Sequence, residues 1–121
     1  MIKKVAFTMY TVTDMSRARA FYEKTLGLKV GSNYDDKWVE YDLPEGGCFA
    51  ITNMAQGVSP STTAGGSIAF EVSDIKQLVD ELKQKQVQFK VDIFESPVCF
   101  MAVPIDSEGN AFMLHQLKNP R

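Results

Sequence analysis

The feature that most constrains the fold is an internal repeat. Residues 5–15 and residues 65–75 align position for position, so that Val12-Thr13-Asp14 corresponds to Val72-Ser73-Asp74. In both segments apolar and polar residues alternate, as in a half-buried strand, and the segment then reaches an Asp at a helix N-cap position. A duplicated strand-to-helix unit predicts two halves of similar structure.

Each capping Asp is followed by apolar residues at helical spacing. They are Met15, Ala18, Phe21, Tyr22 and Leu26 in the first half, and Ile75, Leu78, Val79 and Leu82 in the second. This spacing predicts that each helix presents one apolar stripe to a sheet. Gly27 can adopt the left-handed conformation that commonly ends a helix, whereas the second helix has no such glycine.

Three strand candidates follow each helix. They are residues 28–31, 37–43 and 48–52 in the first half, and residues 89–93, 98–103 and 111–116 in the second. Turn-forming segments, 44–47 and 106–110, precede the two last strands. The predicted fold class is therefore α+β with two βαβββ modules, one at 1–53 and one at 65–118. A Ser-, Thr- and Gly-rich connector at 53–66 joins them into a single domain, 1–121.

The composition excludes several partners. A net charge of −2, from 13 basic and 15 acidic residues, argues against a nucleic-acid groove. No apolar run is long enough to cross a membrane, and the first residues do not resemble a secretion signal, so we expect a cytoplasmic protein. Cys48 and Cys99 lie singly in apolar segments, which indicates buried, reduced thiols.

Short motifs at both ends of the repeat carry a family resemblance. The strand ending in Val-Ser/Thr-Asp, the helix with Ala20-Phe21-Tyr22, and Leu26-Gly27-Leu28 are followed much later by the turn 106–110, Asp-Ser-Glu-Gly-Asn. Together they resemble the vicinal-oxygen-chelate superfamily of glyoxalases, bleomycin-resistance proteins and dioxygenases, although Ser107 stands where that family has Pro. The resemblance implies a cup-shaped mixed sheet around a pocket, usually completed by homodimerisation. The superfamily contains both enzymes and metal-free drug-binding proteins.

The resemblance also implies where metal ligands would lie. Metal-dependent relatives place one ligand seven residues before each capping Asp and another on each last strand. Those positions hold Phe7, Ala50, Ser67 and Met113 here. Phe and Ala cannot coordinate a metal, a thioether is poorly suited to hard divalent ions, and one Ser is a weak ligand. We therefore expect no metal and no other cofactor.

Strand alternation predicts the lining of the cup. If Phe70 packs under its helix, the opposite face carries Phe7, Met9 and Thr11 in one module and Ser67, Ala69, Glu71, Met113 and His115 in the other. Such a lining suits an organic ligand oriented by one or two polar groups. Ala50, Trp38 and Phe100 are further candidates, the two aromatic residues as stacking surfaces or as core. Alternation does not decide which face of the 37–43 strand, with Glu40 and Asp42, is inward.

Three functions remain open. The leading hypothesis is a metal-independent protein of the bleomycin-resistance type that holds a small organic ligand in a cup at a homodimer interface. The alternative is a glyoxalase-like lyase or isomerase that uses Glu71 and His115, or an atypical metal site. His115 could instead be a rim histidine bonded to backbone, and Glu71 a strand-end carboxylate in water. The third is a scaffold whose cup is filled by its own side chains.

Overall fold

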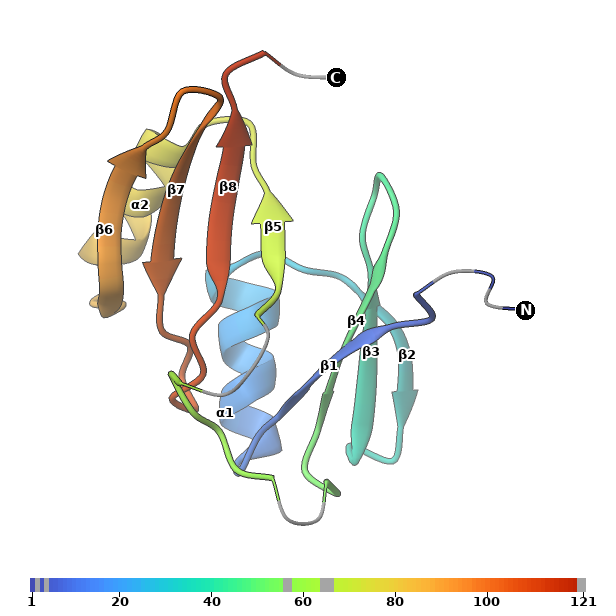
Figure 1. Ribbon diagram of the computed structural model, residues 1–121. Coiled ribbons are helices and arrows are strands. Elements are labelled where there is room, and N and C mark those ends of the chain that lie inside the picture. Colours follow the sequence, from blue (N-terminus) through green and yellow to red (C-terminus); the bar gives the residue numbers. More distant parts are fainter. Residues whose placement is uncertain (2, 4, 56–57, 64–66, 120–121) are drawn as a thin grey trace. The chain divides into compact units, whose positions relative to one another are not determined.

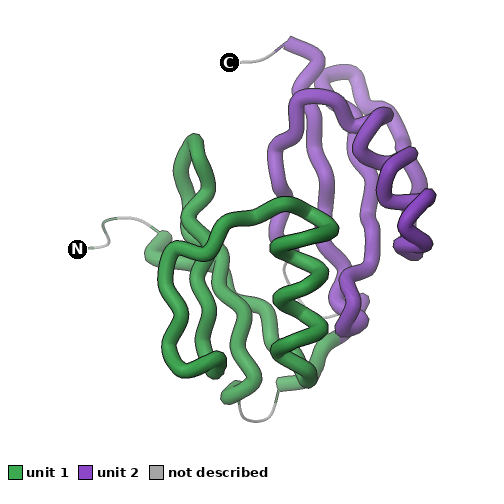
Figure 2. The backbone as a smooth tube through the Cα atoms, turned by 180° about the vertical axis from the view of Figure 1, so that it is seen from behind, with its two compact units in different colours: residues 1–60 green, residues 61–121 purple. Residues whose placement is uncertain are grey.

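The chain folds into two compact units of similar topology. The computed structural model describes residues 1, 3, 5–55, 58–63 and 67–119. Unit 1 is Met1–Pro60 and unit 2 is Ser61–Arg121 (Figure 2). The boundary lies inside the expected connector, of which residues 56–57 and 64–66 are outside the described residues.

Unit 1 is a four-stranded mixed sheet with one helical segment. Its sheet order is β1-β4-β3-β2, in which β1 runs parallel to β4 and the other pairs are antiparallel. The elements, in chain order, are β1 (Thr8–Thr11), α1 (Met15–Arg19), η1 (Ala20–Thr25), β2 (Val30–Tyr34), β3 (Trp38–Asp42) and β4 (Cys48–Thr52).

Unit 2 repeats this arrangement. Its sheet order is β5-β8-β7-β6, again with the first and last strands parallel, and α2 lies behind β6 and β7 in Figure 1. The elements are β5 (Ala69–Glu71), α2 (Ile75–Gln84), β6 (Phe89–Glu95), β7 (Cys99–Pro104) and β8 (Met113–Leu117). The predicted α+β fold of two βαβββ modules is confirmed.

The N-cap residues predicted from the repeat begin both helices. The Asp14 carboxylate accepts a hydrogen bond from the backbone N–H of Arg17 at 3.0 Å, and the Asp74 carboxylate accepts one from Gln77 at 3.1 Å. In unit 1 the helix then buries Tyr22, whose ring lies 5.0 Å from Phe49. The alternating strands and the helical stripe therefore meet in a core on one face of the sheet.

The first helix does not stay α-helical. After α1 it continues as the π-helix η1, and the backbone N–H of Leu26 donates to the carbonyl of Phe21 at 2.9 Å. Tyr22 on this stretch is fully buried, whereas Leu26, the last apolar residue of the expected stripe, is half-buried at the helix end. Gly27 ends the helix in the left-handed region, with φ of +78°, as predicted.

The second helix reaches the same ending without glycine. Gln86 has φ of +65°; its N–H donates to Lys83, and the N–H of Val87 donates to Leu82, each at 3.0 Å. These two bonds form a Schellman motif, which satisfies carbonyls at the helix end. A residue with a Cβ therefore occupies a backbone position that favours glycine.

Of the six strands expected after the helices, only the one at 48–52 has the predicted bounds, and the largest differences are in β2, β6 and β8. β2 starts at Val30 rather than at residue 28, because the backbone N–H of Leu28 donates to the carbonyl of Tyr22 at the end of the helix. A turn with positive φ at both Asp35 and Asp36 then joins β2 to β3. β6 runs to Glu95, and β8 starts at Met113, since Ala111 forms only an isolated bridge.

The closing turn 106–110 is held by a network of hydrogen bonds. The carboxylate of buried Asp106 accepts from the backbone N–H groups of Glu108 and Asn110, both at 2.8 Å. The Asn110 side chain accepts from the N–H of Ser61 at 3.0 Å, which ties the start of unit 2 to the turn before β8. The Asp and Asn of the family-like motif therefore have a structural role.

Replacement of Gln86 by Gly tests the helix ending. We expect Gln86→Gly to raise the free energy of unfolding by about 0.5–1 kcal/mol, because glycine adopts the left-handed conformation without a Cβ clash. Urea denaturation measures the change. Gln86→Ala is the matched control: it keeps the Cβ and should give no gain, and an equal gain from both variants would contradict this explanation.

Candidate functional site

Each sheet has one face covered by its own helix and one that is not, which we call the helix-free face. In unit 1, Tyr41 and Phe49 contact the helix residue Tyr22 and so mark the covered face. Strand alternation and the pairing Met9↔Ala50↔Glu40 then define the opposite face. The side chains that β1, β3 and β4 place on it are Met9, Thr11, Trp38, Glu40, Asp42, Cys48, Ala50 and Thr52.

Trp38, Glu40 and Phe7 form a cluster on this face. The indole Nε1–H of Trp38 donates to a carboxylate oxygen of Glu40 at 2.8 Å. The rings of Phe7 and Trp38 are close to perpendicular, with centroids 5.0 Å apart and planes at 85°. Trp38 and Glu40 are half-buried, whereas Phe7 is 45% exposed. The β3 face that alternation left undecided is thus the helix-free one for Trp38, Glu40 and Asp42.

Cys48 lies opposite Asp42 at the end of this face. It is only half-buried, so the expectation of full burial holds for Cys99 but is wrong for Cys48, which lies at the first residue of β4. Burial raises the pKa of the Cys48 thiol, and the nearby carboxylates of Glu40 and Asp42 raise it further. The thiol therefore stays protonated at neutral pH and is a poor nucleophile.

The helix-free face of unit 2 brings Glu71 and His115 together. They are cross-strand partners on β5 and β8, and Nδ1 of His115 lies 2.5 Å from Oε1 of Glu71. The other carboxylate oxygen accepts from the backbone N–H of Leu117 at 2.9 Å. His115 is 26% exposed and Glu71 55%. Glu71 is a strand-end carboxylate, as one reading of the sequence had it, but its orientation is fixed by two partners.

Most of the other positions on this face are apolar, and the exception among the predicted ones is Ser67. Met113 pairs with Ala69, and Met101 pairs with His115, so thioethers flank the imidazole. Ser67 precedes β5 and is exposed. Phe100 does not belong to this face, because its ring lies beneath the ammonium groups of Lys76 on α2 and Lys118, 5.7 and 5.1 Å from the centroid. The idea that Phe100 stacks a ligand alongside the other candidates is therefore wrong.

The positions expected for metal ligands do not offer a suitable donor set. Phe7 packs on Trp38, Ala50 has no exposed surface, and Met113 lies opposite Ala69. Within the described ranges, no three His, Cys, Asp or Glu side chains lie close enough together to hold a metal ion. A hydrocarbon, a ring and a thioether do not fit a hard divalent ion.

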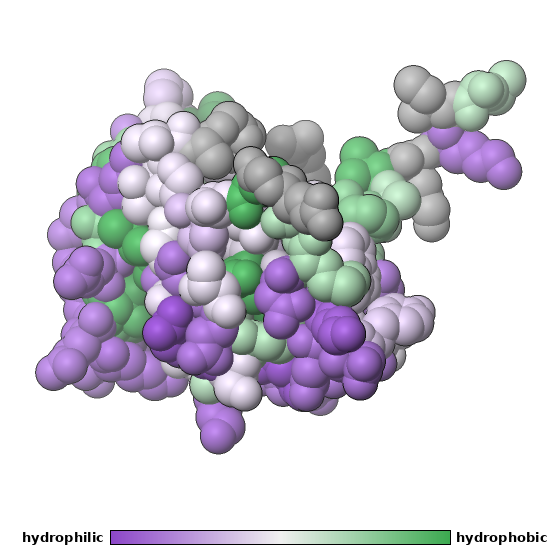
Figure 3. Space-filling model, turned by 90° about the horizontal axis from the view of Figure 1, so that it is seen from below, coloured by the Kyte–Doolittle hydropathy of each residue, from purple (hydrophilic) through white to green (hydrophobic). Residues whose placement is uncertain are grey.

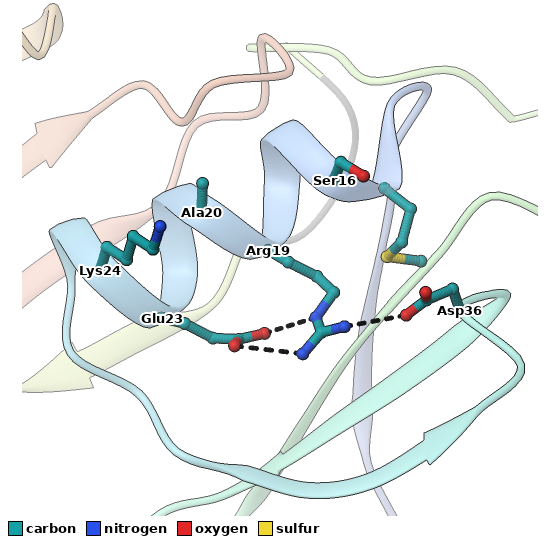
Figure 4. Close-up of a pocket in the computed structure, with 7 residues that line it drawn as sticks. Ser16, Arg19, Ala20, Glu23, Lys24 and Asp36 are labelled. Atoms are coloured by element: carbon teal, nitrogen blue, oxygen red, sulfur yellow. Dashed lines mark hydrogen bonds and ion pairs between the residues drawn. The ribbon is translucent and has the colours of Figure 1, made fainter.

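A second, charged site lies on the helix of unit 1. A shallow pocket of about 240 Å³ is lined by Met15, Ser16, Arg19, Ala20, Glu23, Lys24 and Asp36 (Figure 4). The Arg19 guanidinium lies between two carboxylates, 2.7 Å from Glu23 and 2.9 Å from Asp36. The hydroxyl of Tyr41 also donates to Glu23 at 2.9 Å. These charged groups bond to one another, and through Asp36 the network clamps the β2–β3 turn to the helix.

The network shifts the pKa of its members. Desolvation acts to raise the pKa of Glu23, but hydrogen bonds from Arg19 and Tyr41 outweigh it, and the net shift is downward. Burial, followed by the hydrogen bond to Glu23, raises the pKa of Tyr41. No sequence motif pointed to this clamp; the i,i+4 spacing of Arg19 and Glu23 was the one available signal.

Comparison with known proteins identifies the family. The family model of the Glyoxalase/Bleomycin resistance protein/Dioxygenase superfamily matches residues 4–114. The chain belongs to this superfamily. A comparison with curated protein sequences gives no significant match.

Solved structures of the superfamily share the fold at low sequence identity. An antibiotic-binding protein, TnmS3 from Streptomyces sp. CB03234, is 15% identical, with a TM-score of 0.75 over 98% of this chain and 100% of its own. The fosfomycin resistance protein FosX from Listeria monocytogenes is 17% identical, with a TM-score of 0.74 over 96% and 94%. A superfamily domain from Frankia sp. EAN1pec is 17% identical, with a TM-score of 0.75 over 100% and 96%. These likenesses concern the fold.

Small hydrophobic patches alternate with hydrophilic side chains on the face seen in Figure 3. Among the described residues no helix is both long and apolar enough to cross a bilayer.

The Arg19–Glu23 clamp predicts a pH-dependent stability. Because the folded-state pKa of Glu23 lies below its usual value of roughly 4.3, its contribution is fully present above that pH and is lost as the pH falls through the lower folded-state pKa. We expect Glu23→Gln to cost about 1–2 kcal/mol at pH 7 and progressively less toward pH 3.

Chemical denaturation from pH 7 to pH 3 measures this difference. Glu45→Gln, which removes an exposed carboxylate from the turn before β4, is the control and should leave both stability and its pH dependence unchanged. A constant difference between Glu23→Gln and the unmodified protein at every pH would refute the electrostatic explanation.

Proposed function

We propose that this protein binds a small, partly apolar organic molecule without using a metal ion. The observation that carries the proposal is that the positions of the superfamily's usual metal ligands hold Phe7, Ala50, Ser67 and Met113. The ligand is held in a cup at a homodimer interface, as the superfamily resemblance implies. The cytoplasm is its location, where unpaired cysteines such as Cys48 and Cys99 stay reduced.

The chemistry of the two faces supports a binding role. Unit 1 offers two aromatic rings beside one anchored carboxylate, and unit 2 offers thioethers beside one anchored imidazole. Ligand sites in proteins commonly combine apolar and aromatic walls with a few polar groups that orient the ligand. Methionine adapts to ligands of irregular shape. Nucleic acid is not a suitable partner, because the chain carries a net charge of −2.

The relatives favour a small-molecule ligand over a protein partner. One structural relative is described as an antibiotic-binding protein and another as a fosfomycin resistance protein. At 15% and 17% identity the likeness shows the fold alone. The ligand of this chain therefore follows from its own side chains.

A specific observation favours a second function, a lyase or isomerase. Glu71 binds the Nδ1 side of His115, and the tautomer that donates from Nδ1 leaves a lone pair on Nε2. An imidazole oriented in this way by a carboxylate can remove a proton from a substrate. In this alternative Glu71 is the orienting group and His115 the general base.

A ligand screen tests the binding proposal. We expect at least one aromatic or cationic compound to raise the melting temperature by about 10 °C at saturation, because a ligand at 100 times its Kd stabilises by about 2.7 kcal/mol. The shift should be the same with and without a chelator. Light scattering at micromolar concentration should give the mass of a dimer.

Two outcomes of the screen would count against binding as proposed. A library without any stabilising compound contradicts ligand binding, and a shift that a chelator abolishes contradicts metal independence. A monomer by light scattering contradicts the dimeric cup.

The enzyme alternative has its own measurement. Compounds from the screen are incubated with the protein in D2O, and proton NMR follows exchange or conversion. If the alternative holds, conversion falls by about 100-fold or more in His115→Gln and also in Glu71→Gln. Under the binding proposal every ligand is recovered unchanged. Elemental analysis of protein purified without chelator completes the test, since a stoichiometric metal lost in these variants would indicate an atypical metal site.

A further inference from the structure

The aromatic and charged side chains on the helix-free face of unit 1 indicate which ligand charge this face can bind. We propose that its ligand is a cation, a protonated amine attached to a planar apolar body, recognised by Trp38, Phe7 and Glu40. This inference rests on the proposed function and names the chemical class of its ligand.

The aromatic part of the site suits a cation. Trp is the strongest cation–π acceptor among the side chains. The rings of Trp38 and Phe7 stand at 85° to one another, so they form a corner rather than a stack. The hydrogen bond from Nε1 of Trp38 to Glu40 fixes the direction of the indole and uses only its N–H, not its π-face. A planar group can rest on a ring while the ammonium lies toward the carboxylate.

The charges around this corner disfavour an anionic ligand. Of the side chains that strand register places on this face, only Glu40 and Asp42 carry formal charge, and both are negative. Cys48, opposite Asp42, stays a neutral thiol because burial and both carboxylates raise its pKa. Lys37, the nearest lysine in the sequence, lies before β3 in the turn, with Nζ 4.0 Å from Asp35. An anionic ligand would therefore meet two like charges without a cationic partner on this face.

Partial burial gives the carboxylate its selectivity. Glu40 and Trp38 are half-buried, and Ala50 beside Glu40 has no exposed surface. A charge interaction at such a position is screened less than one on an open surface. A neutral ligand of the same shape stacks on the rings but lacks the charge interaction with Glu40. The site therefore selects among such ligands by their charge.

A matched set of three ligands tests the proposal. The protein contains one tryptophan, so the indole N–H gives one assigned NMR signal in 15N-labelled protein. The probes are 2-naphthylmethylamine, 2-naphthylmethanol and 2-naphthoate at pH 7, which share a ring system and differ in charge. We expect the amine to shift the Trp38 signal with a Kd about tenfold lower than the alcohol, and naphthoate to bind more weakly than both.

Variants identify the carboxylate responsible. Glu40→Gln keeps an acceptor for the indole N–H but removes the charge, and should reduce the preference for the amine over the alcohol to about threefold or less. Glu45→Gln removes the same charge from the exposed turn before β4 and should keep the full preference. Asp42→Asn, a second variant on the same face, should reduce the preference by a smaller factor, and it serves if Glu40→Gln does not fold.

The outcomes separate this inference from the binding proposal. Equal binding of the amine and the alcohol, tighter binding of naphthoate, or equal effects of Glu40→Gln and Glu45→Gln would overturn the cation assignment. Binding function would survive if the screen still gave neutral or anionic ligands that shift the Trp38 signal. If no compound in the screen binds, the binding proposal fails and the cation assignment fails with it.

Discussion

The parallel pairing of the first and last strand in each unit determines which side chains share a face. Met9 pairs with Ala50 in unit 1, and Ala69 pairs with Met113 in unit 2. Because successive residues of a strand point to opposite sides, a slip of one residue would exchange the buried and helix-free faces. Phe49, which packs against Tyr22, prevents such a slip in unit 1 by occupying the helix-covered core.

This shared frame carries different chemistry in the two units. In unit 1 the polar group is Glu40 on β3, held by the indole of Trp38, whereas in unit 2 it is Glu71 on β5, held by His115 and by the backbone of Leu117. Both carboxylates accept from N–H groups, so their directions are set before a ligand arrives. Such preorganisation reduces the entropy lost on binding. The two units share a sheet arrangement but carry different side chains on the helix-free face.

The sequence predicted those parts of the fold that depend on local periodicity. The repeat, both capping Asp residues and the alternation of β1 and β5 follow from period-2 and helical patterns. The inward face of β3 could not be predicted, because it depends on a two-residue turn at Asp35 and Asp36 that lacks the usual glycine.

Features that depend on longer-range contacts could not be predicted from the sequence either. The π-helical turn before Leu26 and the left-handed Gln86 depend on tertiary packing and on helix-end hydrogen bonds, not on residue type. The contact of Glu71 with His115 needs the register of two strands 44 residues apart in the chain.

Under the proposed function, the loss of the metal ligands has a consequence for the charge of the site. A divalent ion is usually the largest local charge where it binds, and it attracts anionic or chelating oxygen atoms. A scaffold that carries Phe7 and Ala50 at the ligand positions lacks that positive charge, while Glu40 and Asp42 remain on the same face. The formal charges on this face are then negative. Substitution at the ligand positions therefore changes which ligands the scaffold accepts as well as whether it can perform metal-assisted chemistry.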